Sequence, residues 1–107
     1  MTKLNQNDAI NRIAGTSLKG YINEYTYSQL VAALGEPTFN TASDDGKVQK
    51  EWVFDYNGDV FTIYDWKTYS EEFTTQNLDT WNVGGKTNAS GFLDAFAEQM
   101  FNYLTTK

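Results

Sequence analysis

The four residues Gly84-Gly85-Lys86-Thr87 come closest, by type and order, to a loop that binds phosphate. In a P-loop, the backbone amides of a glycine-rich turn hold the phosphates and a lysine reaches them. The full motif needs another glycine five residues before Gly85, and that position is Thr80. The residues therefore favour an ordinary glycine turn between a strand and a helix. Anion or nucleotide binding by Gly84, Gly85, Lys86 and Thr87, at the free amides of a helix start, is the alternative.

Asp55, Asn57 and Asp59 have the spacing of the first ligands of a calcium-binding loop. Such a loop needs glycine at its sixth position and glutamate at its twelfth, where this chain has Val60 and Trp66. The turn that Asn57 and the glycine after it predict uses the same residues. We therefore expect no metal site here.

Two adjacent pairs of acids, Asp44-Asp45 and Glu71-Glu72, are the other candidates for catalysis. Hydrolysis of a glycosidic bond needs two carboxyl groups that face each other across a cleft at about 5–10 Å; sequence spacing alone does not show such a geometry, and adjacent acids in polar loops are usually solvated. The chain has no histidine and no cysteine, which removes the serine–histidine triad, thiol nucleophiles and thiolate metal sites. We expect no catalytic residues, no metal and no cofactor.

Tyr64, Trp66 and Trp81 form the least ordinary part of the sequence, because both tryptophans stand beside polar residues near predicted strand ends. One interpretation is that Trp66 and Trp81 cover the second face of a sheet. The other is that Tyr64, Trp66 and Trp81 form a surface that binds another protein, since tryptophan and tyrosine are enriched at interfaces.

A β-hairpin centred on Asn57-Gly58 is the element expected to position these residues. Asn-Gly between two runs of β-branched and aromatic residues is the strongest short-range signal for a type I′ turn, so we expect strands over about 48–56 and 59–66. At the far end of the hairpin, Lys50 and Asp65 are expected to form a cross-strand ion pair. The two-residue turn fixes the register and places four apolar side chains on one face: Trp52, Phe54, Phe61 and Ile63.

Helices are expected near residues 8–14, 27–34 and 90–104, with a third strand near 80–83. The middle helix has the clearest signal, because Thr26 and Gln29 form a capping box before an apolar stripe of helical period. This order of elements predicts an α+β fold with an antiparallel sheet. The other two N-caps are expected at Asn7 or Asp8 and at Asn88 or Ser90.

The composition is that of one globular domain spanning residues 1–107, with 40% hydrophobic and 16% aromatic residues. The net charge of −6 disfavours direct binding to nucleic acid, which needs clustered lysine and arginine. No apolar run approaches the ~20 residues of a membrane span, and no signal peptide is recognisable. Together with the absence of cysteine, these features favour a cytoplasmic protein.

Four motifs in one order resemble a family of small uncharacterised proteins of tailed phages and environmental viruses. The motifs are Gly35–Thr38 (GEPT), Asp45–Lys47 (DGK), Thr62–Lys67 (TIYDWK) and Trp81–Lys86 (WNVGGK, on the pattern WxVGGK). The resemblance implies a viral protein that acts in bacterial cytoplasm, and it brings no catalytic residues. Family members commonly carry a histidine after the tryptophan of the last motif, where this chain has Asn82.

These observations predict a small phage accessory protein that binds a host or phage protein through an aromatic surface and has no catalytic activity. Two alternatives stay open. The first is a protein that binds a small molecule, nucleotide or anion at residues 84–87. The second is a structural protein that forms homo-oligomers through the broad apolar face predicted for the helix at 90–104.

Overall fold

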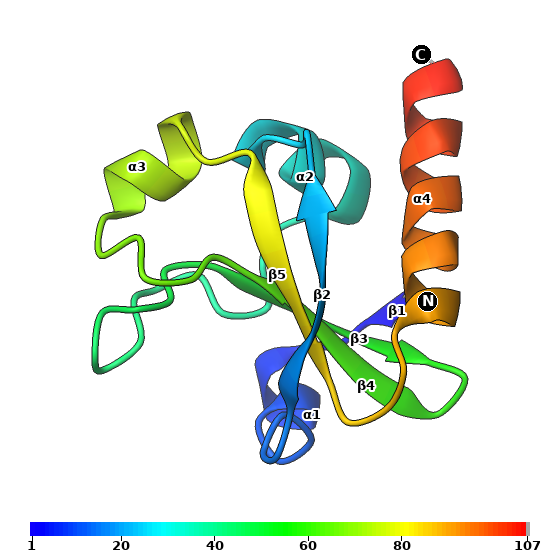
Figure 1. Cartoon of the computed structure of the whole chain (residues 1–107), viewed down its shortest axis with the longest axis horizontal. Helices are drawn as coiled ribbons and strands as arrows, with labels where there is room; N and C mark the ends of the chain where they lie inside the picture. The colour runs from blue at the N-terminus through cyan, green and yellow to red at the C-terminus, as the bar shows by residue number, and fades with distance from the viewer. Residues whose placement is uncertain (107) are drawn as a thin grey trace.

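The computed structural model describes residues 1–106 and has the α+β fold that the sequence predicts. A five-stranded antiparallel sheet lies at the centre of the described chain, with helices packed around it (Figure 1). The strands are β1 (Thr2–Lys3), β2 (Ser17–Asn23), β3 (Glu51–Tyr56), β4 (Asp59–Tyr64) and β5 (Thr80–Gly85). The helices are α1 (Gln6–Ala9), α2 (Tyr27–Leu34), α3 (Glu71–Gln76) and α4 (Ser90–Thr105).

The β3–β4 hairpin has the predicted register. Asn57 and Gly58 have φ angles of 53° and 88°, as a type I′ turn requires. The strand order is β1-β3-β4-β5-β2, so this hairpin lies inside the sheet and β1 and β2 form its edges. The predicted inward-facing pairs are present: Trp52 with Ile63, and Phe54 with Phe61.

The face of the sheet that carries Trp52 is the core side, and it packs against α2 and α4. Trp52 and Trp81 meet edge to face with ring centroids 5.5 Å apart, and Phe92 of α4 stacks on Phe61 at 4.8 Å. Each of the two indole N–H groups donates to a backbone carbonyl oxygen, at 2.8 and 2.9 Å. Buried aromatic rings therefore make up the centre of the core without leaving an indole donor unpaired.

The predicted capping box opens α2. The Thr26 hydroxyl accepts a hydrogen bond from the Gln29 amide at 3.3 Å, and the Gln29 side chain accepts one from the Thr26 amide at 2.8 Å. The helix ends at Leu34, before Gly35, whose φ of 86° is a conformation that glycine adopts readily. The predicted range of this helix, 27–34, is therefore confirmed.

The last predicted helix, α4, begins at Ser90 as expected, whereas α1 spans Gln6–Ala9 and not the predicted 8–14, and both helices have other N-cap residues than expected. Asn5, not Asn7 or Asp8, caps α1, because its side chain accepts from the amide three residues later at 2.9 Å. The N-cap position of α4 is Ala89, not Asn88 or Ser90. The Asn88 side chain instead accepts from the amide two residues later, at 2.8 Å, which is a local turn contact.

The prediction that Lys50 and Asp65 form an ion pair is wrong. Both residues are buried, and the Asp65 carboxylate accepts from the backbone amides of Gln49 and Lys50 at 2.8 and 2.9 Å. The carboxylate thus occupies the place that a carbonyl of the opposite strand would take. The regular pairing of the two strands therefore ends at Glu51 and Tyr64.

The second face of the sheet is covered at one end. There Ala9 of α1, Val53 and Val60 form a small buried cluster, which Ile13 and Phe39 extend. The remainder of this face, over β2, β5 and the C-terminal part of β4, exposes large side chains to solvent. We call this remainder the open face, and it is the surface on which the candidate site lies.

Candidate functional site

A row of four side chains crosses the open face from β3 to β2. Glu51 pairs with Tyr64, Tyr64 with Asn82, and Asn82 with Tyr21. Directly opposed residues of antiparallel strands point to the same side of the sheet, with Cβ atoms about 4.5–5.5 Å apart. Burial raises the pKa of the Tyr64 phenol, and its hydrogen bond with Asn82 acts in the opposite direction. At neutral pH the phenol therefore stays protonated and able to donate.

Trp66 extends this row beyond the end of β4. Its ring meets Tyr64 edge to face, with centroids 6.2 Å apart and planes at 87°. The Nζ atoms of Lys47 and Lys67 each lie 5.7 Å from the indole centroid, within the range of a cation–π contact. Tyr21 is 56% exposed and Trp66 48% exposed. We call Tyr21, Tyr64 and Trp66 the aromatic strip.

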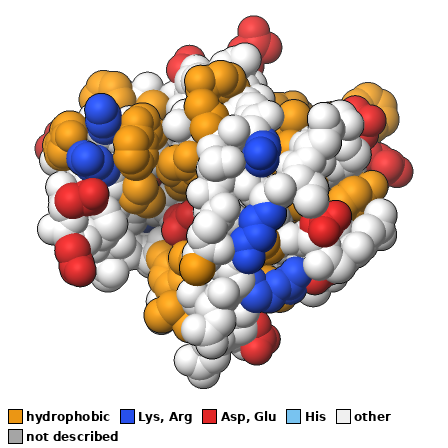
Figure 2. Space-filling model, turned by 60° about the horizontal axis from the view of Figure 1, so that its bottom comes forward, with side chains coloured by type: hydrophobic (Ala, Val, Ile, Leu, Met, Phe, Trp, Pro, Cys, Tyr) orange, Lys and Arg blue, Asp and Glu red, His pale blue; other side chains and the backbone are white. Residues whose placement is uncertain are grey.

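Figure 2 shows a side of the molecule on which hydrophobic side chains gather next to lysine or arginine on a projecting lobe. A hollow separates this lobe from the central part of the molecule, and further hydrophobic side chains lie along the hollow. Hydrophobic side chains beside cations, at the border of a hollow, are features of surfaces that contact other molecules.

The prediction that Trp81 shares a surface with Tyr64 and Trp66 is wrong. Val83 pairs with Ile63, so the alternation along β5 places Trp81 on the core side of the sheet. There it is completely buried. For the same reason Trp81 does not cover the second face, and it belongs to the core instead.

The prediction of a glycine turn at residues 84–87 is also wrong for its first two residues. Gly84 and Gly85 do not form a turn and are the last residues of β5. Strands pair with β5 on both sides there, so the backbone of these glycines takes part in the sheet. A Cβ atom would lie 2.8 Å from Thr62 Oγ1 at Gly84 and 2.8 Å from Phe61 Cδ1 at Gly85. Close packing, not phosphate binding, thus accounts for both glycines. Lys86 and Thr87, both exposed, follow in the connection to α4.

A cavity of about 520 Å³ opens beside Glu51, where the open face meets the covered end of the sheet. Burial raises the pKa of the Glu51 carboxyl to about 7. The neighbouring Thr62 hydroxyl lowers the pKa again, and the charge of Asp65 adds to the rise. None of the ion pairs formed within residues 1–106 includes Glu51. The main lining residues are Ile10, Ile13, Phe39, Asp44, Val48 and Glu51.

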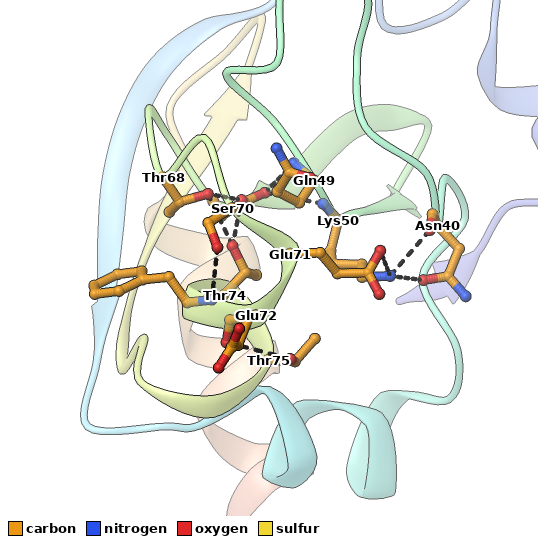
Figure 3. A network of polar contacts seen from close by, with 11 residues as sticks. Asn40, Gln49, Lys50, Thr68, Ser70, Glu71, Glu72, Thr74 and Thr75 are labelled. Atoms are coloured by element: carbon orange, nitrogen blue, oxygen red, sulfur yellow. Dashed lines mark hydrogen bonds and ion pairs between the residues drawn. The ribbon is translucent and has the colours of Figure 1, made fainter.

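The segment that carries Trp66 is held by a buried carboxylate. Besides the two backbone amides, Asp65 accepts hydrogen bonds from the hydroxyls of Thr68 at 2.6 Å and Thr74 at 2.7 Å. Figure 3 shows these threonines close to Lys50, within one polar network around α3. Asp65 therefore fixes the backbone directly before Trp66 relative to β3 and α3.

The two acidic pairs lie in separate local environments. Glu71, in the first turn of α3, lies 3.7 Å from Lys50 Nζ (Figure 3). Asp45 accepts from the Lys47 amide and the Ser43 hydroxyl, and these bonds lower the pKa of its carboxyl. Neither pair presents two carboxyls across a cleft, which is the geometry that glycoside hydrolysis requires.

Asp55 takes part in the hairpin turn that the sequence predicts at these residues. One of its carboxylate oxygens accepts from the Gly58 amide at 3.1 Å, and the other pairs with Arg12 at 2.7 Å. These two contacts lower the pKa of Asp55. Nowhere in residues 1–106 do three acidic side chains gather as a metal site would require.

The C-terminal part of α4 has an exposed apolar side. Phe101 is 65% exposed, and Leu104, one turn further, is also exposed. In Figure 1 the last turns of α4 rise past the neighbouring elements. Across the described residues, no helix has both the length and the apolar character of a membrane span.

Comparison of the chain with protein-family models, with curated proteins and with solved structures finds no match. The resemblance to phage proteins therefore stays a prediction.

Sequence reasoning missed two residues of the site, Tyr21 and Glu51. The hairpin register already places Glu51 opposite Tyr64, which is the signal for its position on the open face. Tyr21 lies on a strand whose partner is β5, and no local pattern in the sequence specifies that pairing. The cavity depends on the fold of residues 39–48, so it has no signature in the sequence.

Proposed function

We propose that this chain is a protein-binding module without catalytic activity and that the aromatic strip is its contact surface. The observation that supports the proposal is the exposure of Trp66 and Tyr21 on a face that the chain leaves open, while Trp52 and Trp81 are completely buried. An exposed tryptophan and tyrosine supply large contact area at little cost in conformational entropy.

The chemistry around the strip favours one kind of partner. Tyr21 and Tyr64 offer apolar rings, and Lys47 and Lys67 place two positive charges beside Trp66. The fitting partner is a protein segment with an apolar side chain next to an acidic one. If the resemblance to phage proteins is correct, this partner is a host or phage protein in bacterial cytoplasm.

Capture from bacterial lysate with matched variants tests the proposal. Trp66→Ala and Tyr21→Ala each remove an exposed ring, and Phe101→Ala removes an equally exposed ring from α4 as the control. We expect a protein that the natural chain and F101A retain and that W66A and Y21A release. Retention that is the same for all four chains would contradict the proposal. Emission from the buried Trp52 and Trp81 reports whether each variant is folded.

Self-association through α4 is the second candidate function. It is favoured by Phe101 and Leu104, which lie one turn apart and are both exposed. Light scattering at two protein concentrations measures it. A dimer that Phe101→Ala dissociates would support this function, and a monomer at both concentrations would exclude it.

A further inference from the structure

We infer that the cavity beside Glu51 is a binding site for a small amphipathic amine, a molecule with an apolar body and one ammonium group. None of the three residues of the aromatic strip lines the cavity, although Glu51 stands directly opposite Tyr64 in the hairpin, so the two sites adjoin without sharing a residue of the strip. The inference therefore does not depend on the proposed protein-binding function.

The walls of the cavity fit an apolar body. Ile10 and Ile13 follow α1 on one side, and Phe39 and Val48 belong to the connection between α2 and β3 on another. A volume of about 520 Å³ is within the range of small-molecule sites. A phenylalkyl group would remove these side chains from water and gain the usual free energy of apolar burial.

The ionisable groups that line the cavity, Asp44 and Glu51, are both acidic. The cations of the adjoining segments are engaged elsewhere. Arg12 pairs with a carboxylate of β3 at 2.7 Å, Lys47 lies beside the indole of the aromatic strip, and Lys50 contacts a carboxylate of α3 at 3.7 Å. The site therefore lacks a positive charge, and an ammonium group supplies one in a charge-assisted hydrogen bond to Glu51.

Binding should depend on pH through Glu51. The titratable groups next to it are Tyr64 of β4 and Asp65, which directly follows β4, and Asp44 of the loop lines the same cavity; none of them is a cation. Because the pKa of Glu51 is about 7, the carboxyl is mostly protonated at pH 5.5 and mostly ionised at pH 8. An ammonium ligand prefers the ionised form, so its affinity should rise over this range.

Calorimetry with three probes that share one body tests the inference: 4-phenylbutylamine, 4-phenylbutanol and 4-phenylbutyrate. At pH 8 we expect the amine to bind the natural chain about tenfold more tightly than the alcohol, and the carboxylate to bind least. Glu51→Gln should remove the preference for the amine and leave the alcohol unchanged. Glu98→Gln, at an exposed position of α4, is the charge-matched control and should keep the preference.

Three results would overturn the inference. The first is equal affinity for amine and alcohol in the natural chain at pH 8. The second is a preference for the amine that survives in E51Q. The third concerns NMR: we expect the methyl resonances of Ile10, Ile13 and Val48 to shift when the amine binds, and the contradicting result is that they do not. Shifts elsewhere with these methyls unmoved would place the amine outside the cavity.

Discussion

Glu51→Gln should stabilise the folded chain above pH 7 and leave its stability nearly unchanged below pH 4.5. In the folded protein the Glu51 carboxyl has a pKa of about 7, against an ordinary value of 4.5, because burial penalises its charge. The folded chain therefore binds this proton more tightly than the unfolded chain does. Stability associated with protonated Glu51 is complete below pH 4.5 and is lost as the pH rises through 7. Glutamine cannot ionise, so the variant avoids that loss.

The magnitude follows from the two pKa values. The difference between the unfolded-state pKa of 4.5 and the folded-state pKa of about 7 means that Glu51→Gln should raise the free energy of unfolding by about 3 kcal/mol at pH 8 and about 1 kcal/mol at pH 5. The Thr62 hydroxyl faces the carboxyl, is itself buried and finds no other partner within residues 1–106. It can bond either the acid or the amide, so the substitution costs little in hydrogen bonding.

Urea unfolding at pH 5, 6, 7 and 8, followed through tryptophan emission, measures the free energy of unfolding of both chains. The difference in the free energy of unfolding between Glu51→Gln and the natural chain should increase steadily with pH. Glu98→Gln, which removes the same charge from an exposed position of α4, should stay within about 0.5 kcal/mol of the natural chain throughout. A difference in unfolding free energy between E51Q and the natural chain that is the same at pH 5 and pH 8 would show that folding does not raise the pKa of Glu51.

Four further substitutions test the positions of other side chains, each by urea unfolding. Asp65→Ala should cost about 4 kcal/mol, because it leaves two backbone amides and two threonine hydroxyls without their buried acceptor; a cost under about 1 kcal/mol would show that the carboxylate is dispensable. Gly85→Ala should cost about 1–3 kcal/mol, since the new methyl would lie 2.8 Å from Cδ1 of the Phe61 ring, and an unchanged midpoint would mean that this ring does not pack against Gly85. Trp81→Ala should cost about 3–5 kcal/mol as a core cavity, whereas Trp66→Ala should cost under about 1 kcal/mol; equal losses would contradict their assignment to core and surface.

The hairpin and α2 could be predicted because their signals are local. The Asn57-Gly58 turn sets a register that needs no information from the rest of the chain, and the Thr26–Gln29 box closes within one helical turn. The same register places Glu51 opposite Tyr64, so part of the site followed from the hairpin alone.

The remaining elements depend on contacts that are distant in sequence. β1 has two residues and forms only by pairing with β3, far along the chain. α3 is a short, mostly polar helix anchored by the Thr74 hydroxyl on Asp65, a contact between loop and helix that propensity does not encode. The side of the sheet on which Trp81 lies is set by the pairing of β5 with β4, across the connection that Asp65 organises. These long-range contacts determine which tryptophan lies in the core and which lies on the surface.

The most direct test of the proposed contact surface is an NMR titration of the isotope-labelled chain with the protein that it captures. We expect shifts centred on Tyr21, Tyr64 and Trp66, together with protection of the Trp66 indole from acrylamide quenching. Shifts centred instead on Phe101 and Leu104, with the Trp66 indole as accessible as before, would contradict the proposed contact surface.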